Sequence, residues 1–199
     1  SKCRLRLLKY IPTEGEDFLD LGSGPIQYPE YLEYSKNFSK RYCVDLSSKA
    51  LEKAEKKLGK HGKYFVGSFF DIEFKKNSFD CAVTLHAVYH MDKNMQEQAI
   101  RKLVSLLKPG KPLIIVYSNP FSLEQCILLP LRLIKNLFKF FINSIFKLIG
   151  KKEVLFTEKY YFRPFNLQWW NSFDDIAKVQ IRPWRTFGVR FQRLIFPNN

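Results

Sequence analysis

The sequence predicts an α/β fold in which strands and helices alternate around a parallel sheet. Short apolar runs recur between residues 18 and 117 and are separated by segments with helical periodicity. The first run, residues 18–21, passes directly into Gly22-Ser23-Gly24. This pattern indicates a buried strand that enters a glycine loop, because Gly22 and Gly24 can adopt φ > 0 and leave bare backbone open to a nucleotide-like ligand.

The other elements follow this strand in a regular order. We expect helices over residues 4–10, 27–37, 47–58 and 94–107, and strands over residues 41–45, 63–66, 79–84 and 113–117. Ser47 or Ser48 can cap the helix that follows the second strand. Pro109 and Gly110 then stop the helix that precedes the fifth strand. Five strands that alternate with helices predict a parallel sheet with right-handed crossovers.

The end of the chain breaks this alternation. Residues 177–185 and 189–196 are strand-like runs joined by Thr186-Phe187-Gly188. We expect a hairpin at this place, so that one strand runs antiparallel to the others.

Composition fits a globular protein of one domain. The chain has 199 residues, 46% of them hydrophobic, which is enough for a sizeable core. Its four cysteines include no Cys-x-x-Cys pair, so we expect buried thiols in a reducing, cytoplasmic compartment. The sequence shows no secretory signal and no apolar run of about 18 residues. Because it opens abruptly at Ser1, we expect that residues preceding Ser1 are missing.

Four motifs in this order resemble those of the class I S-adenosylmethionine-dependent methyltransferases. They are Asp20-Leu21-Gly22-Ser23-Gly24 after the first strand, Asp45 at the end of the second, Gly67-Ser68-Phe69 after the third, and residues 77–83 around the start of the fourth. The likeness covers about residues 10–117 and the final hairpin. It implies a Rossmann-like three-layer sandwich whose seven-stranded, mostly parallel sheet has the order 3-2-1-4-5-7-6, with strand 7 antiparallel.

The resemblance also implies S-adenosyl-L-methionine as the cofactor and assigns residues to it. Gly22 and Gly24 would pass under its methionine part, and Asp20 would help to hold its amino group. Asp45 would accept hydrogen bonds from both ribose hydroxyls, although it could instead cap the next helix. The complete expected set is Asp20, Gly22, Ser23, Gly24, Asp45, Leu46, Ser68, Phe69 and Leu85.

Two positions depart from the family pattern. The family often has a third glycine where Ile26 stands, and an aspartate that contacts adenine where Ser68 stands. We therefore expect Ser68, or the backbone N–H of Phe69, to contact the adenine edge. NAD is the nearest rival ligand, but Gln27 occupies the last glycine position of the Gly-x-Gly-x-x-Gly pattern.

Methyl transfer from a sulfonium needs an aligned nucleophile, a dry site and, for some acceptors, removal of a proton. His86 lies near the end of the fourth strand and is the candidate general base, with a packing role as the alternative. His86 and His90 do not form a His-Glu-x-x-His motif, so we expect no metal site.

Residues 120–165 lie between the fifth strand and the last helix, and we expect them to form a helical insertion within the single domain of residues 1–199. Apolar residues fill positions 121–150 and leave a narrow basic stripe, with no acidic residue between Glu124 and Glu153. Two interpretations stay open. The insertion is a lid over the carboxyl ends of the strands, or it contacts an anionic membrane surface and holds the protein peripherally at the inner face.

The sequence thus predicts methyl transfer to a small or amphiphilic acceptor, at oxygen, nitrogen or carbon. A catalytically inactive, methyltransferase-like binding or scaffold domain is one alternative. Methylation of RNA is another, because the formal net charge of +14 favours anionic partners. Nucleic acid is the less favoured partner, since we find no RNA-binding module and a basic composition also follows from AT-rich codon usage.

Overall fold

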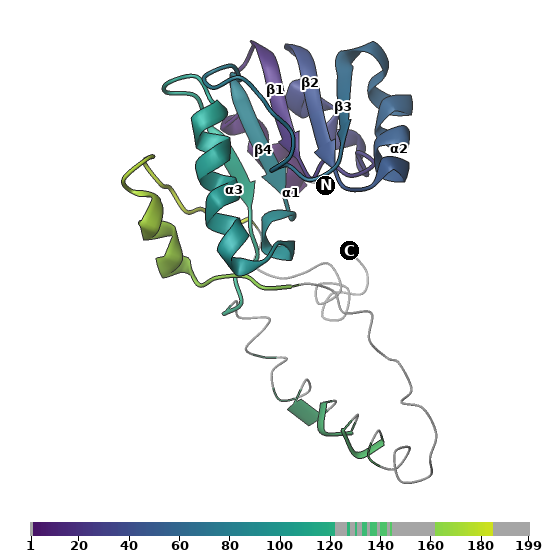
Figure 1. Ribbon diagram of the computed structural model, residues 1–199, viewed down its shortest axis with the longest axis vertical. Helices are drawn as coiled ribbons and strands as arrows, with labels where there is room; N and C mark the ends of the chain where they lie inside the picture. Colours follow the sequence, from purple (N-terminus) through teal and green to yellow (C-terminus); the bar gives the residue numbers. More distant parts are fainter. Residues whose placement is uncertain are drawn as a thin grey trace. The chain divides into compact units, whose positions relative to one another are not determined.

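The computed structural model describes residues 2–121 and 162–184, together with separate helical residues between 127 and 144. The chain divides into two compact units. Unit 1 consists of residues 1–118 and 162–181, and unit 2 of residues 119–161 and 182–199. The sheet and all the labelled elements belong to unit 1 (Figure 1).

The sheet of unit 1 has five parallel strands in the order β3-β2-β1-β4-β5. Its strands are β1 (Gly15–Leu21), β2 (Phe38–Asp45), β3 (Gly62–Val66), β4 (Cys81–Leu85) and β5 (Leu113–Val116). This order confirms the α/β prediction and the first five places of the predicted topology. The chain order reverses between β1 and β4, where open α/β sheets form their ligand crevice at the carboxyl ends of the strands.

The predicted hairpin is not seen where the structure describes the chain. Residues 177–184 are irregular rather than a strand, and residues 185–199 lie outside the described residues. Pro183 explains part of this difference, because proline has no N–H to donate to a strand ladder. The last two strands of the seven-stranded order therefore remain a prediction.

Helices flank the sheet. The regular helices of unit 1 are α1 (Lys2–Leu5), α2 (Ser48–Leu58) and α3 (Lys93–Leu106). The 3-10 helices are η1 (Arg6–Lys9), η2 (Pro29–Tyr31), η3 (Glu33–Ser35), η4 (Gly59–His61), η5 (Val88–His90) and η6 (Leu167–Phe173). Ser47 caps α2 as predicted, since its hydroxyl accepts the N–H of Ala50 at 3.2 Å. Leu51 and Ala54 face the sheet and are buried.

The expected helix over residues 27–37 is wrong. The segment instead forms η2 and η3, two short 3-10 turns. One cause is that the carbonyl of Tyr31 accepts a hydrogen bond of 2.6 Å from the Arg41 side chain. An acceptor engaged in this way competes with the regular i to i+4 ladder of an α-helix. The segment is therefore shaped by a distant residue, which lies on β2.

The core lies between the sheet and α3. The largest buried cluster joins residues of β1, β2 and β4 to α3, among them Leu19, Ala82 and Leu103, each 0% exposed. Figure 1 shows α3 running along the β4 side of the sheet and α2 beside β3. A second cluster packs Trp170 and Phe173 of η6 against Ile100 of α3. Within the part of the chain that the structure describes, none of the helices combines the length and apolar character needed to cross a bilayer.

Candidate functional site

A pocket of about 170 Å³ opens at the carboxyl ends of β1 and β4. It is lined by Asp20, Gly22, Ser23, Gly24, Pro25, Gln27, Tyr31, Leu85 and His86. These residues come from the end of β1, the glycine loop, the η2 turn and the end of β4. The pocket thus lies at the topological switch point of the sheet, where such folds bind ligands.

The two glycines of the loop serve different purposes. Gly22 has φ of 69° and Gly24 has φ of 56°, which is the left-handed region that side chains rarely adopt. A Cβ on Gly22 would lie 2.3 Å from the Cβ of Ala87, so this position has no room for a side chain. A Cβ on Gly24 would meet nothing within 4 Å. Gly22 therefore lets the loop pack against η5, whereas Gly24 leaves open space over bare backbone.

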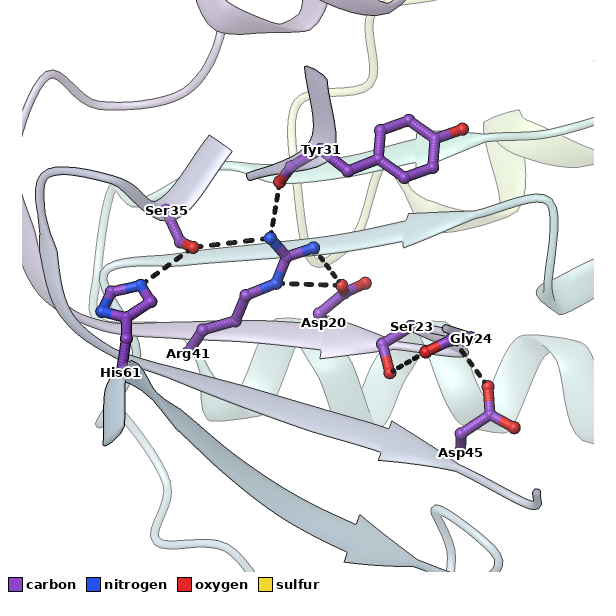
Figure 2. A network of polar contacts seen from close by, with 8 residues as sticks. All are labelled: Asp20, Ser23, Gly24, Tyr31, Ser35, Arg41, Asp45 and His61. Carbon is purple, nitrogen blue, oxygen red and sulfur yellow. Dashed lines mark hydrogen bonds and ion pairs between the residues drawn. The ribbon is translucent and has the colours of Figure 1, made fainter. Parts of the chain in front are cut away.

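Asp45 fixes the loop to the end of β2. Its Oδ2 accepts the N–H of Gly24 at 2.9 Å, and its Oδ1 accepts the N–H of Ser47 at 2.9 Å. Figure 2 shows the first of these contacts. The carboxylate joins the glycine loop to Ser47, and Ser47 rather than Asp45 is the N-cap of α2. The contact of Asp45 with a ribose stays a prediction. Each carboxylate oxygen still has a second lone pair for a further donor.

Lys57 of α2 holds the far side of the same loop. Its ammonium donates to the carbonyls of Pro25 and Ile26 at 2.9 and 2.7 Å. Ile26 is 1% exposed and has φ of 47°, which is unusual for a β-branched residue. This is the position where the related family often has glycine. The buried side chain and the Lys57 contacts hold a backbone shape that glycine would adopt without strain.

Asp20 points its carboxylate toward Arg41 of β2 (Figure 2). Arg41 donates to Oδ2 of Asp20 from Nε at 3.1 Å and from Nη2 at 2.5 Å. Both side chains are inside the protein, with exposed fractions of 3% for Asp20 and 0% for Arg41. Burial raises the pKa of the Asp20 carboxyl, and the Arg41 guanidinium opposes that rise. Asp20 therefore lines the pocket as one half of a buried ion pair.

The other side of Arg41 reaches the pocket wall. Its Nη1 donates to the carbonyl of Tyr31 at 2.6 Å and to the hydroxyl of Ser35 at 3.4 Å, and Nε2 of His61 lies 3.1 Å from the same hydroxyl. The sequence analysis missed this role because it placed Arg41 at the start of a strand, whereas β2 begins three residues earlier. The available signal in the sequence was the charge of Arg41 within a run of strand-forming residues, because a buried charge requires a partner.

His86 lies at the pocket in a strained conformation. Its φ is 61°, and its N–H donates to the carbonyl of Val116 at 3.0 Å. Nδ1 of its ring lies 3.0 Å from the hydroxyl oxygen of Tyr89. A residue other than glycine with positive φ is uncommon, and such strain gathers at functional sites. The structure thus brings the candidate general base to the same space as Asp20 and the glycine loop.

Four of the residues expected to bind the cofactor lie outside the pocket lining, namely Asp45, Leu46, Ser68 and Phe69. Leu46 is 78% exposed. Ser68 accepts the N–H of Phe70 on its hydroxyl at 3.2 Å. Phe69 is 3% exposed, and its ring packs in the core beside the Lys102 ammonium. A ligand could therefore reach Phe69 only through its backbone, so the expected contact between the N–H of Phe69 and adenine stays a prediction.

The described residues include no candidate metal-binding site. Among residues 2–121 and 162–184, and the separate helical residues between them, no three His, Cys, Asp or Glu side chains gather closely enough to hold an ion. The cysteines Cys43 and Cys81 are buried free thiols. Burial raises the pKa of Cys43 and of Cys81 to about 12, so both are unreactive packing residues.

Residues 19–115 match the protein family described as "Methyltransferase domain". No curated protein sequence matches the chain significantly. Among solved structures, a putative methyltransferase from Bacillus halodurans is 16% identical with a TM-score of 0.59, over 88% of this chain and 68% of that one. The YcgJ protein from Bacillus subtilis is 18% identical with a TM-score of 0.58, over 86% and 66%.

A more distant structure is phosphoethanolamine N-methyltransferase 1 from Haemonchus contortus, solved with phosphoethanolamine and S-adenosylhomocysteine. It is 14% identical with a TM-score of 0.52, over 57% of this chain and 25% of that one. The chain therefore spans from a quarter to about two thirds of the length of these proteins. At these identities the likeness shows the fold.

Proposed function

We propose that this chain is a class I S-adenosylmethionine-dependent methyltransferase, because residues 19–115 match a methyltransferase domain. It transfers a methyl group from S-adenosyl-L-methionine to a small or amphiphilic acceptor. One observation carries the proposal. The bare backbone of Gly24, the carboxylate of Asp20 and the imidazole of His86 line one pocket at the carboxyl ends of β1 and β4.

The residues present fit this cofactor. The cofactor supplies an electrophilic methyl group on a sulfonium and leaves as a neutral thioether. Asp20 is an anion beside the space that the methionine ammonium would occupy, and Gly24 leaves that space open. Asp45 lies at the adjoining strand end, bonded to Gly24, with acceptor capacity left for ribose hydroxyls. Ser68 and the backbone of Phe69 follow β3 and are proposed for the adenine edge.

His86 is proposed to accept a proton from the acceptor. The base role requires the tautomer in which Nδ1–H donates to the hydroxyl oxygen of Tyr89, because Nε2 is then the basic nitrogen. The same contact fixes the plane of the ring. Acceptors whose nucleophile carries no proton need no such base, and His86 then orients the acceptor.

Calorimetric titration with S-adenosylhomocysteine tests the cofactor assignment. We expect saturable binding at micromolar concentration, which is about −8 kcal/mol. Absence of heat up to millimolar ligand would favour a binding or scaffold domain that has lost the cofactor. An S-adenosylhomocysteine-release assay with acceptors grouped by polarity then identifies the acceptor class. If RNA is the acceptor, its binding should weaken steeply as salt increases.

The exposed side chains of the insertion support the proposal that the acceptor is amphiphilic. They also support contact between the protein, which we propose to be cytoplasmic, and an anionic membrane surface. Described residues of unit 2 expose large apolar side chains, among them Leu137 at 59%, Phe138 at 66% and Phe141 at 63%. In the sequence, lysine and arginine recur among these residues, with no acidic residue between Glu124 and Glu153. Apolar and basic residues together are typical of helices that bind the membrane interface. A lid that covers the pocket is the other use of the same segment.

Vesicle co-sedimentation separates these two uses. We expect the protein to bind vesicles that contain anionic phospholipid at low salt, and to be released as salt screens the charges. Neutral vesicles serve as the control. If anionic vesicles bind no more protein than neutral ones, the lid is the better interpretation of the insertion.

A further inference from the structure

We propose that Arg41 is a positioning residue that assembles one wall of the cofactor pocket before the cofactor binds. The inference rests on the proposed function, since it concerns the affinity of that same site. Arg41 does not line the pocket itself. It acts through Asp20 and Tyr31, which do.

The first step of the argument is the geometry of the guanidinium. It is fully buried, and its three nitrogens donate toward Asp20, the carbonyl of Tyr31 and the hydroxyl of Ser35. Figure 2 shows this side chain between the carboxylate on one side and the η2–η3 segment on the other. Only a planar fork with donors in several directions can satisfy these acceptors together, because a lysine ammonium is a single point.

The second step is the weakness of the wall that Arg41 holds. Residues 29–35 form only two 3-10 turns, which have few hydrogen bonds of their own. Their outer side packs on α1, where the Arg4 guanidinium lies 3.3 Å from the centroid of the Tyr28 ring and Nη1 lies 3.2 Å from Oε1 of Glu30. Arg41 supplies the corresponding contact from inside. The segment is thus held between two arginines, and only Arg41 also contacts Asp20.

The third step concerns the charge of Asp20. Both hydrogen bonds from Arg41 go to Oδ2, so the orientation of the carboxylate is fixed and Oδ1 remains for a cationic ligand group in the pocket that Asp20 lines. Without the guanidinium, a buried carboxylate would be unpaired and would tend to take up a proton. A neutral Asp20 would lose its charge-assisted contact with an ammonium group.

The test compares three variants by their melting temperatures and their affinities for S-adenosylhomocysteine. Arg41→Met removes the guanidinium, and Arg41→Lys keeps the charge without the fork. Lys108→Met is the matched control, because Lys108 also pairs with a buried carboxylate, that of Asp80, at 2.9 Å, but at the amino ends of the strands. The wild-type titration comes first. If the wild-type protein binds no ligand, the proposed function fails, and the role of Arg41 falls with it.

Arg41→Met should weaken ligand affinity about tenfold or more, equivalent to about 1.4 kcal/mol, while Lys108→Met should leave it within about twofold. Arg41→Lys should recover most of the lost melting temperature but little of the affinity. The proposal is overturned, with the proposed function intact, if Arg41→Lys restores affinity together with stability. It is also overturned if Lys108→Met weakens binding as much as Arg41→Met does.

Hydrogen exchange of the wild-type protein keeps the proposal testable even if both Arg41 variants fail to fold. A wall assembled in advance should show amides of residues 30–35 exchanging at least about tenfold more slowly than an unfolded chain before any ligand is added. Exchange of these amides at the unfolded-chain rate in the free protein would overturn the proposal.

Discussion

The amino ends of the parallel strands form one side of the sheet, here called the amino edge, and their carboxyl ends form the opposite side, the carboxyl edge. The two are built in opposite ways. At the amino edge, Asp80 precedes β4 and closes the start of β1, since its Oδ2 accepts the N–H groups of Glu16 and Asp17 at 3.0 and 3.3 Å. Lys108 lies against the same carboxylate and is partly open to solvent. These contacts connect β1, β4 and the segment before β5, and none of the residues in them lines the pocket described above.

At the carboxyl edge, by contrast, the residues surround a pocket. Gly22, Gly24, Ile26 and His86 all have positive φ, and Asp20 is paired with an arginine that has no access to water. Both edges contain a carboxylate and a cation, and the pocket described above lies at the carboxyl edge. Positive φ also occurs near the amino edge, at Asn77 and Gly110, so neither an ion pair nor a strained residue identifies a site by itself. The carboxyl edge differs because the strained residues and the ion pair lie around one pocket.

The largest effect should follow from replacing the strained histidine. If His86 takes a proton from the acceptor, His86→Asn should lower the turnover rate about 100-fold to 10,000-fold, because an asparagine cannot act as a base. Asparagine tolerates positive φ, so the loop should keep its shape. The measurement is the rate of S-adenosylhomocysteine release under saturating cofactor. An unchanged rate, with unchanged affinity, would show that the ring only packs or orients.

Replacing one glycine at each edge compares the two edges by the unfolding free energy that each substitution costs. Gly22→Ala places a Cβ 2.3 Å from that of Ala87, and should cost about 2–5 kcal/mol of unfolding free energy from backbone strain and overpacking together. Gly110 has a similar φ of 75° near the start of β5, but a Cβ there meets nothing within 4 Å. Gly110→Ala should therefore cost only about 1–2 kcal/mol.

Urea unfolding measures both glycine variants, and ligand titration shows which of them touches the site. Gly22→Ala should lose ligand affinity even where it is folded, and Gly110→Ala should keep it. Equal costs for the two substitutions would mean that the contact with Ala87 relaxes easily.

Removing the carboxylate that joins loop and strand should have a smaller effect. Asp45→Ala should weaken S-adenosylhomocysteine binding by about 1–3 kcal/mol, the range for losing charge-assisted hydrogen bonds. The loss of the Gly24 contact adds a destabilisation of the loop. Asp45→Asn is the control, because an amide oxygen can still accept from one N–H group. Full affinity in the alanine variant would place the ribose elsewhere.

The smallest expected effect is a pH-dependent loss of stability when the Asp80 carboxylate is removed from the amino edge. Burial alone would raise the pKa of Asp80, but Lys108 and two backbone N–H groups outweigh it and hold the pKa below its ordinary value of 3.8. A carboxyl whose pKa is lowered by folding stabilises the protein above its unfolded pKa, and that contribution is lost as pH falls through the folded value.

Asp80→Asn should therefore cost about 1–2 kcal/mol at neutral pH, and the difference from wild type should shrink as the pH falls below about 4. Thermal melting of both proteins between neutral and acidic pH measures it. Ligand affinity should stay unchanged throughout. A gap that persists at the acidic end would mean that the aspartate acts through shape rather than charge.

Sequence patterns predicted the elements whose signals are local. The alternation of strands and helices, the Ser47 cap and the glycine loop after β1 all depend on residues close together in the chain. The same reasoning failed over residues 27–37, where the helical pattern was overruled by a hydrogen bond from Arg41. It could not tell that the Phe69 ring packs in the core, because a motif position does not show whether a side chain turns toward the pocket or away from it.

What the sequence determined by itself is the succession of strands and helices along the chain, the glycine bend and the acidic ends of β1 and β2, since periodicity and turn chemistry act over a few residues. Only the tertiary structure decided that Asp20 and Arg41 are partners and that His86 lies beside them. Those pairings join residues from different strands, and the register that brings them together is set by the packing of the whole sheet rather than by any local pattern.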